Sequence, residues 1–201
     1  LGLILRRTRK LPTRHSPLHP LTYETLIGLL ACTGLRPGEA LRLRLCDFDA
    51  AGAQLRIAPC KSSPERMIPL HASTVQALER YRRVRRRLFP LGDGLFVGAT
   101  GLPLSARRTE KVFRRLTCGL AVNGERRHPR LVDFRHAFAS SWIARWSREA
   151  KPVSHYLSRL ARFLGHHDFT STWWYVASDP KALAAAADSF RRFHEQSRGL
   201  P

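Results

Sequence analysis

The sequence predicts a mixed α+β fold that is mainly α-helical and carries one small antiparallel β-sheet. Apolar residues recur at helical spacing along most of the 201 residues. Two short alternating segments, residues 53–58 and 67–70, flank a polar turn that contains Pro64, which is typical of a β-hairpin. A hydrophobic content of 43% is sufficient for a packed core, and the length suits one domain or little more.

The expected elements follow from apolar spacing and from residues that start or stop helices. Gly34 and Gly165 each follow an amphipathic run, where glycine commonly ends a helix. Pro37 suits the first position of the next helix, and Ser73 with Gln76 forms a capping-box signature. The segments expected to be helical are residues 21–33, 37–45, 73–88, 105–116, 133–146, 153–163 and 181–194, and the expected strands are residues 53–58, 67–70 and 95–97.

The charge of the chain indicates a polyanionic partner. Lys and Arg number 35 against 15 Asp and Glu, so the net charge is +20. Such an excess of positive charge disfavours the compact state through self-repulsion. Binding to nucleic acid, which is negatively charged, readily explains it. Arginine greatly outnumbers lysine, which suits phosphate recognition, although a GC-rich genome would enrich arginine too. The run of arginines at 82, 83, 85, 86 and 87 is expected on one helix face, either solvated or facing DNA.

The cysteines and the apolar segments argue against several other classes of protein. The four cysteines are widely spaced and form no CxxC pair, so neither a metal site nor a disulfide scaffold is expected. The longest apolar stretch, near residues 26–35, is too short to span a bilayer. We therefore expect a cytoplasmic protein without metal, cofactor or membrane contact.

Three basic residues occupy positions that suit an anion. Arg36 lies in a tight turn between two helices, Arg135 in the first turn of a later helix, and Lys61 at the tip of the hairpin. Backbone N–H groups at a turn that opens a helix also face an anion. Each residue has a purely structural alternative: ion pairs of Arg36 with Glu39 or Asp47, an ion pair of Arg135 with Asp133, and a solvated Lys61.

A further candidate segment follows the helix that Gly165 ends. His166 and Tyr175 lie nine residues apart, on either side of a turn and a second short helix opened by Asp168 or Thr170. A helix cap and a buried aromatic would be ordinary roles for them. Together with two arginines and a lysine, however, they suit phosphodiester chemistry. Guanidinium forks can hold the non-bridging oxygens, a lysine can protonate the leaving oxygen, and a tyrosine can act as nucleophile.

These motifs resemble the catalytic domain of the tyrosine recombinases, the phage-integrase and Xer-like group, over roughly residues 21–193. The matching stretches are Thr-Gly-Leu-Arg-Pro-Gly-Glu-Ala-Leu at 33–41, Lys61 with Glu-Arg-Met-Ile-Pro-Leu at 65–70, Asp-Phe-Arg-His-Ala-Phe-Ala at 133–139, and Leu-Gly-His at 164–166 with Tyr175. The resemblance implies a tyrosine-recombinase catalytic-domain-like fold over residues 21–195, after a basic arm or linker at 1–20 and before a tail at 196–201.

The resemblance also implies roles and partners. Arg36 and Arg135 would clamp the scissile phosphate of double-stranded DNA, and Lys61 would protonate the leaving 5′ oxygen. His166 would hydrogen-bond the phosphate, and Tyr175 would form a 3′-phosphotyrosyl link. Site-specific recombination of a mobile element would follow, in a homotetramer on DNA. The helix at residues 181–194 would dock on a neighbouring protomer.

Two departures from the family pattern affect this expectation. Val132 stands three residues before Arg135, where the family usually has a histidine, and only His128 and His136 lie nearby. Few residues precede the expected catalytic domain. The alternatives are therefore a catalytically impaired, DNA-binding recombinase remnant with a regulatory role, a strand-passing activity like that of type IB topoisomerases, and a basic helical protein that binds RNA.

Overall fold

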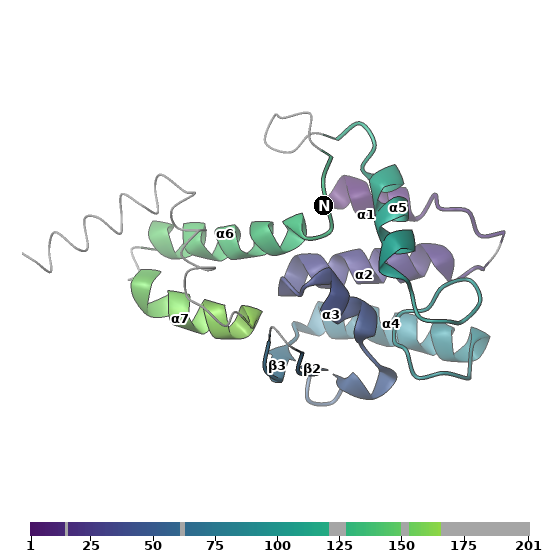
Figure 1. The fold of residues 1–201 in the computed structure, drawn as a ribbon, viewed down its shortest axis with the longest axis horizontal. Helices are drawn as coiled ribbons and strands as arrows, with labels where there is room; N and C mark the ends of the chain where they lie inside the picture. The colour runs from purple at the N-terminus through teal and green to yellow at the C-terminus, as the bar shows by residue number, and fades with distance from the viewer. Residues whose placement is uncertain (15, 61–62, 121–127, 150–152, 166–201) are drawn as a thin grey trace, which may run out of the picture. The chain divides into compact units, whose positions relative to one another are not determined.

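The computed structural model describes residues 1–14, 16–60, 63–120, 128–149 and 153–165 (Figure 1). The chain divides into two compact units. The first unit comprises Leu1–Pro59 with Glu65–Arg135, and the second comprises Cys60–Pro64 with His136–Pro201. The predicted class is confirmed, since the described residues are mainly helical with one three-stranded antiparallel sheet.

The first unit is built around one buried helix, α2. It contains the helices α1 (Gly2–Thr8), α2 (His19–Thr33), α3 (Pro37–Arg42), η1 (Leu45–Asp47, 3-10), α4 (Ala72–Leu88) and α5 (Ala106–Leu116). A helix that is apolar on most sides is stable only when neighbours cover it. Helix α2 has buried residues on most of its surface and packs against α1, α3 and α4, and Figure 1 shows it running alongside α4.

The sheet has the strand order β1 (Phe48–Asp49), β2 (Gln54–Ile57), β3 (Arg66–Pro69). Leu55 pairs with Ile68, and both are buried on the inner face. The predicted hairpin of β2 and β3 is confirmed, but the third strand is not at residues 95–97. That segment is buried because it is apolar, yet within it only Val97 forms a bridge, an isolated one to Pro103. The two-residue strand β1 completes the sheet instead.

Residues 1–20, expected to be an arm or linker, contain a helix and contribute buried side chains. They include α1, and Ile4, Leu11 and Leu18 are buried. The Arg7 guanidinium donates from Nη1 to the carbonyls of Leu116 and Cys118, at 2.8 Å each, where α5 ends. A few apolar residues among many charges are enough to pack the segment against the rest of the first unit.

Helix α4 corrects the expectation of a uniform arginine face. Arg83, Arg86 and Arg87 are exposed, but Arg85 is fully buried. Its guanidinium donates to the carbonyls of Phe89, Leu91 and Gly92 at 2.6–3.4 Å. Phe89 is the C-cap of α4, and Leu91 and Gly92 follow it, so Arg85 ties the segment after the helix to the last turn of α4.

The start of α4 also differs from the prediction. The N-cap is His71, whose Nδ1 accepts a hydrogen bond from the Ser73 backbone N–H at 3.3 Å. The expected capping box of Ser73 and Gln76 is therefore wrong. An imidazole nitrogen that lacks a proton can accept this bond as a hydroxyl would, which allows the helix to begin one residue earlier, at Ala72.

The second unit contains α7 (Val153–Leu164) and most of α6 (Asp133–Arg148), both confirmed as helices. Its core consists of Ala139, Ile143, Leu157, Leu160 and Leu164, with Phe138, Trp146 and Phe163 packed against it. Helix α7 is followed by Gly165, whose φ of 70° is favoured by glycine. Within the described residues, no helix combines the length and the apolar character needed to cross a membrane.

Candidate functional site

The turn between α2 and α3 presents Arg36. Gly34 caps α2 in the left-handed conformation, at φ 63° and ψ 19°, and its N–H donates to the Leu30 carbonyl at 3.0 Å. A residue with a Cβ would be strained there. The chain then returns to extended geometry at Arg36, which is the N-cap of α3, and Pro37 begins the helix. The local sequence therefore explains the turn at which Arg36 stands.

Glu39 holds Arg36 at two points. Its carboxylate accepts a hydrogen bond from the Arg36 backbone N–H at 3.0 Å and another from Arg36 Nη1 at 3.2 Å. The expected ion pair of Arg36 with Glu39 is thus present. The Glu39 side chain is only 2% exposed, whereas that of Arg36 remains 30% exposed. Arg36 is therefore held by Glu39 and remains partly exposed.

Arg66, at the start of β3, binds the same carboxylate. Its Nη1 and Nη2 donate to the two Glu39 oxygens at 3.0 and 2.8 Å. Burial on its own would raise the pKa of the Glu39 carboxyl. The hydrogen bonds from Arg66 and from the Arg36 backbone, together with both guanidinium charges, hold that pKa below its ordinary value. Glu39 therefore stays ionised between two arginines.

Arg135 reaches the same turn from a distant part of the sequence. Its Nη1 donates to the Gly34 carbonyl at 3.0 Å across 101 residues of sequence, and the residue is 3% exposed. Gly34 lies two positions before Arg36, so the structure brings both predicted arginines to one turn of the first unit. The sequence order alone could not show this proximity.

The residues before Arg135 are ordered by a local cap. The Asp133 carboxylate accepts from the Arg130 backbone N–H at 2.7 Å and from Arg130 Nη2 at 3.2 Å. Val132 is half-buried, and its carbonyl accepts from the Arg135 backbone N–H at 3.0 Å. A valine side chain cannot exchange a proton. His128 and His136, the two nearby histidines, are both exposed.

Three predicted site residues lie outside the described residues: Lys61, His166 and Tyr175. The hairpin that would carry Lys61 is present on both sides, as β2 and β3. The short helix expected before Tyr175 and the helix expected at residues 181–194 also lie outside the described part. The roles of these residues stay predictions.

Arg66 was missed by the sequence reasoning, although a signal for it existed. In β3 the residues that face inward alternate, and Ile68 is buried. Residues two apart on a strand share a face, so Arg66 shares the face of Ile68. An arginine on a buried face needs a partner, and Glu39 is that partner.

A basic surface on the first unit accompanies the arginine turn. Helix α5 buries Thr109, Phe113 and Leu116. Its exposed residues include Arg107, Arg108, Lys111, Arg114 and Arg115. This arrangement presents positive charge along one side of the helix, as phosphate-binding helices do. Among the residues that the structure describes, no group of three or more His, Cys, Asp or Glu could hold a metal ion.

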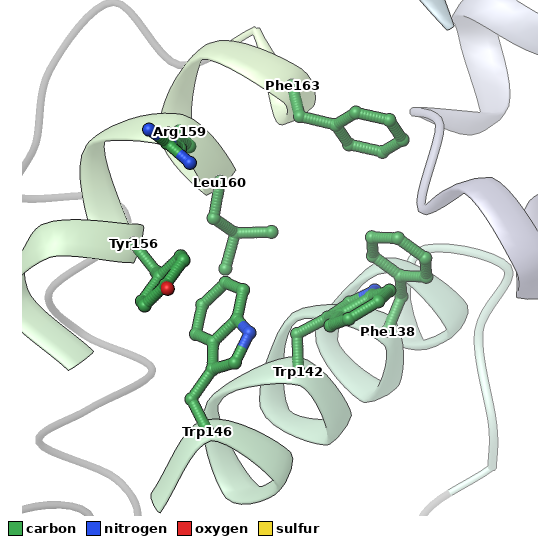
Figure 2. Close-up of a pocket in the computed structure, with 7 residues that line it drawn as sticks. All are labelled: Phe138, Trp142, Trp146, Tyr156, Arg159, Leu160 and Phe163. Atoms are coloured by element: carbon green, nitrogen blue, oxygen red, sulfur yellow. The ribbon is translucent and has the colours of Figure 1, made fainter. Parts of the chain in front are cut away.

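The second unit has an aromatic groove between α6 and α7 (Figure 2). Trp146 stacks on Tyr156 with centroids 5.2 Å apart, and Phe138 stacks on Phe163 at 5.7 Å. The groove has a volume of about 230 Å³. Its lining residues are Phe138, Trp142, Trp146, Tyr156, Arg159, Leu160 and Phe163. We call this surface the aromatic groove.

Comparison with known proteins gave consistent matches. The family model described as the phage integrase family matches residues 11–182. The integrase/recombinase y4rB of Sinorhizobium fredii is 32% identical over 196 residues, covering 94% of this chain and 62% of that protein. The tyrosine recombinase XerC of Pseudomonas syringae pv. tomato is 30% identical over 166 residues, covering 83% of this chain and 51% of XerC.

Solved structures share the fold. The XerA recombinase superposes with a TM-score of 0.69 at 20% identity, over 100% of this chain and 63% of that one. The XerH site-specific recombinase bound to its difH substrate superposes with a TM-score of 0.69 at 24% identity. The match covers 92% of this chain and 51% of XerH. The chain thus spans between half and two thirds of the length of these four proteins.

Proposed function

Because this chain belongs to the phage integrase family of tyrosine recombinases, we propose that it cleaves and rejoins DNA strands in site-specific recombination, as the integrase or recombinase of a mobile element. The observation that supports this most is the placement of Arg36 and Arg135 at one turn. Guanidinium groups stabilise the charge that develops on a phosphate under attack. With DNA as substrate and bacterial relatives, we place it in a bacterial cytoplasm.

The chemistry assigns one task to each predicted residue. The Tyr175 oxygen would attack phosphorus and form the 3′-phosphotyrosyl ester, while the bond from phosphorus to the 5′ oxygen breaks. The phenolic proton of Tyr175 would pass to water, because the Val132 side chain cannot accept it. Lys61 would donate the proton that the leaving 5′ oxygen needs. Arg36, Arg135 and His166 would stabilise the non-bridging oxygens. Attack by a 5′ hydroxyl on the phosphotyrosine reverses these steps, so the strand is rejoined without loss of the ester bond.

Val132 affects the expected rate of DNA cleavage. A missing general acid or base lowers a rate by roughly 10²–10⁴-fold, so cleavage is expected to be slow and to speed up when a histidine is restored. The same residue is the reason for the second candidate, a DNA-binding remnant with a regulatory role. Relatives that cover most of this chain are named as integrases and recombinases, which favours the enzyme.

Assembly on DNA would use the C-terminal segment. A structure of lambda integrase, with a TM-score of 0.60 at 17% identity, is a tetramer bound to a Holliday junction. We propose that four copies act together and that residues 181–194 dock on a neighbouring copy. Their apolar residues recur at helical spacing, namely Leu183, Ala186, Ala187, Phe190 and Phe193. The aromatic groove offers an apolar surface of matching chemistry.

Covalent trapping tests the proposed function. The chain is incubated with nicked duplexes made from the DNA that flanks its own coding sequence, and adducts are resolved on a denaturing gel. A shifted band that disappears in Tyr175→Phe and weakens in Arg36→Ala supports the recombinase. Val132→His should strengthen the band. No band in either the natural chain or Val132→His, with salt-sensitive binding retained on native gels, would support the remnant.

A further inference from the structure

The Arg66–Glu39 pair is the most enclosed of the ion pairs measured in the described part of the chain, with side chains 8% and 2% exposed. We propose that Arg66 is a positioning residue for DNA cleavage: it fixes the Glu39 carboxylate, which in turn holds the Arg36 guanidinium ready for the scissile phosphate. This inference rests on the proposed function in one respect, namely that Arg36 binds that phosphate.

The hydrogen bonds give Glu39 a single orientation. Oε1 accepts from Arg36 Nη1 at 3.2 Å and from Arg66 Nη1 at 3.0 Å. Oε2 accepts from the Arg36 backbone N–H at 3.0 Å and from Arg66 Nη2 at 2.8 Å. A carboxylate offers about four acceptor positions, so this one is fully used. It cannot rotate without losing contacts to both arginines.

Charge balance explains why a second arginine is needed. Glu39 carries one negative charge and lies between two guanidinium groups. With Arg66 present, its charge is balanced by a residue that is itself almost enclosed, and Arg36 brings its own positive charge to the turn. Without Arg66, the carboxylate would be free to pair with Arg36 through both oxygens. Arg36 would then be turned towards Glu39 and partly neutralised.

The geometry is specific for arginine. Two parallel N–H groups from one planar fork meet two oxygens of one carboxylate, which a lysine ammonium cannot reproduce. Lysine would retain the charge but hold the carboxylate less firmly. The rate of DNA cleavage by Arg66→Lys is therefore expected to lie between the rates of the natural chain and of Arg66→Met. The methionine variant removes the charge altogether.

The chain supplies a matched control in Arg56. It lies on the neighbouring strand β2 and pairs with the buried Asp47 at 2.7 Å. Arg56→Met removes one arginine and one ion pair, as Arg66→Met does, but none of its measured contacts involves Glu39 or Arg36. Each variant removes one positive charge, so the loss of DNA attraction should be similar in the two. The loss of stability should be smaller in Arg56→Met, because the Arg56 side chain is 44% exposed.

The experiment compares Arg66→Met, Arg66→Lys and Arg56→Met in the full chain. The orientation of Arg36 is followed by the Nε–H signals of ¹⁵N-labelled arginine, with Arg36→Lys identifying the Arg36 signal. The rate of covalent adduct formation is measured on the nicked duplexes described above. A misplaced group costs up to about 100-fold in rate, so we expect Arg66→Met to lower the maximal rate by roughly 10- to 100-fold, with KM changed far less.

We expect the Arg36 signal to shift or broaden in Arg66→Met, partly recover in Arg66→Lys, and stay unchanged in Arg56→Met. An unchanged Arg36 signal in Arg66→Met, with a rate equal to that of Arg56→Met, would overturn the inference. If Arg66→Met does not fold, Arg66→Lys and Glu39→Gln are read in its place. If the natural chain forms no adduct, the proposed function fails, and the Arg36 signal alone decides whether Arg66 positions it.

Discussion

At the residue scale, one buried carboxylate organises the arginine turn. Glu39 contacts the backbone and side chain of Arg36 and both ends of the Arg66 fork. Removing one member of a buried ion pair leaves an uncompensated charge, which costs more than the pair contributes. The three residues should therefore respond to substitution as a unit, with effects that are not additive.

The lowered pKa of Glu39 predicts how stability depends on pH. A carboxyl with a lower pKa in the folded state stabilises fully above its ordinary pKa of 4.5, and this contribution is lost as the pH falls through the folded value. The natural chain should lose free energy of unfolding in that window. Glu39→Gln should be less stable at pH 7 by on the order of 3 kcal/mol and should lose less below pH 4.5.

Urea unfolding at several pH values between neutral and acid checks this expectation. Glu110 supplies the control, because partial burial and the nearby Asp133 raise the pKa of its carboxyl. Glu110→Gln should therefore not reduce stability at pH 7. Equal pH profiles for the natural chain and Glu39→Gln would show that the carboxylate is not held as described.

At the element scale, the connection from α2 to α3 depends on one glycine. Gly34 adopts φ 63°, which costs a residue with a Cβ about 1–2 kcal/mol. Gly34→Ala should lower the free energy of unfolding by about that amount and slow adduct formation, since it moves Arg36 and the carbonyl that Arg135 binds.

Substitution of Gly28, inside α2, is expected to change stability in the opposite direction to substitution of Gly34. An added Cβ at Gly28 would meet nothing within 4 Å, and alanine is favoured over glycine inside a helix by about 0.5–1 kcal/mol. Gly28→Ala should therefore stabilise the chain in the same denaturation measurement. A loss of stability at both positions would contradict the assigned conformations.

The end of α4 makes a second prediction at this scale. Arg85→Met would leave the carbonyls of Phe89, Leu91 and Gly92 without their guanidinium donor. A hydrogen bond from a charged group contributes about 1.5–3 kcal/mol to stability. The adjacent Arg86 is exposed, so Arg86→Met should change stability by less than about 0.5 kcal/mol. Thermal unfolding of both variants compares them, and equal melting temperatures would refute the buried role of Arg85.

At the scale of the whole molecule, the net charge of +20 predicts strongly salt-dependent DNA binding. Each phosphate contact contributes about 0.9 to the slope of log K against log salt. Arg114, exposed on α5, is expected to make one such contact, so Arg114→Ala should reduce the slope by about that amount. Arg9 is already paired with Glu24 at 2.9 Å, and Arg9→Ala should change the slope less. Equal slopes for the two variants would remove α5 from the DNA surface.

Assembly gives the last prediction. If residues 181–194 dock in the aromatic groove of a neighbouring copy, Phe190→Asp and Trp142→Ala should each reduce tetramers on DNA while binding of a single copy persists. Burying a charge in an apolar groove is unfavourable, and a lost tryptophan removes much of the contact area. Mass photometry on DNA counts the copies, with the exposed Ser140→Ala as control. Intact tetramers in both variants would exclude this groove.

Much of the fold was predictable because its signals are local. Glycine after an apolar run marked the end of α2, and apolar spacing marked α6 and α7. The third strand was misplaced because residues 95–97 are as apolar as a strand, while pairing with Leu55 and Gln54 made a strand of only Phe48 and Asp49. Strand pairing depends on which segments meet in space, and local composition does not record that.

The sequence by itself determined the excess of positive charge and the order of the motifs around Arg36, Lys61, Arg135, His166 and Tyr175, whose catalytic roles stay predictions. The tertiary structure decided which arginines do what. Arg85 closes a helix, Arg66 holds a carboxylate, and Arg36 remains partly exposed. The reason is physical: all arginines carry the same charge, and only burial and distant partners such as Gly34 and Glu39 distinguish their roles.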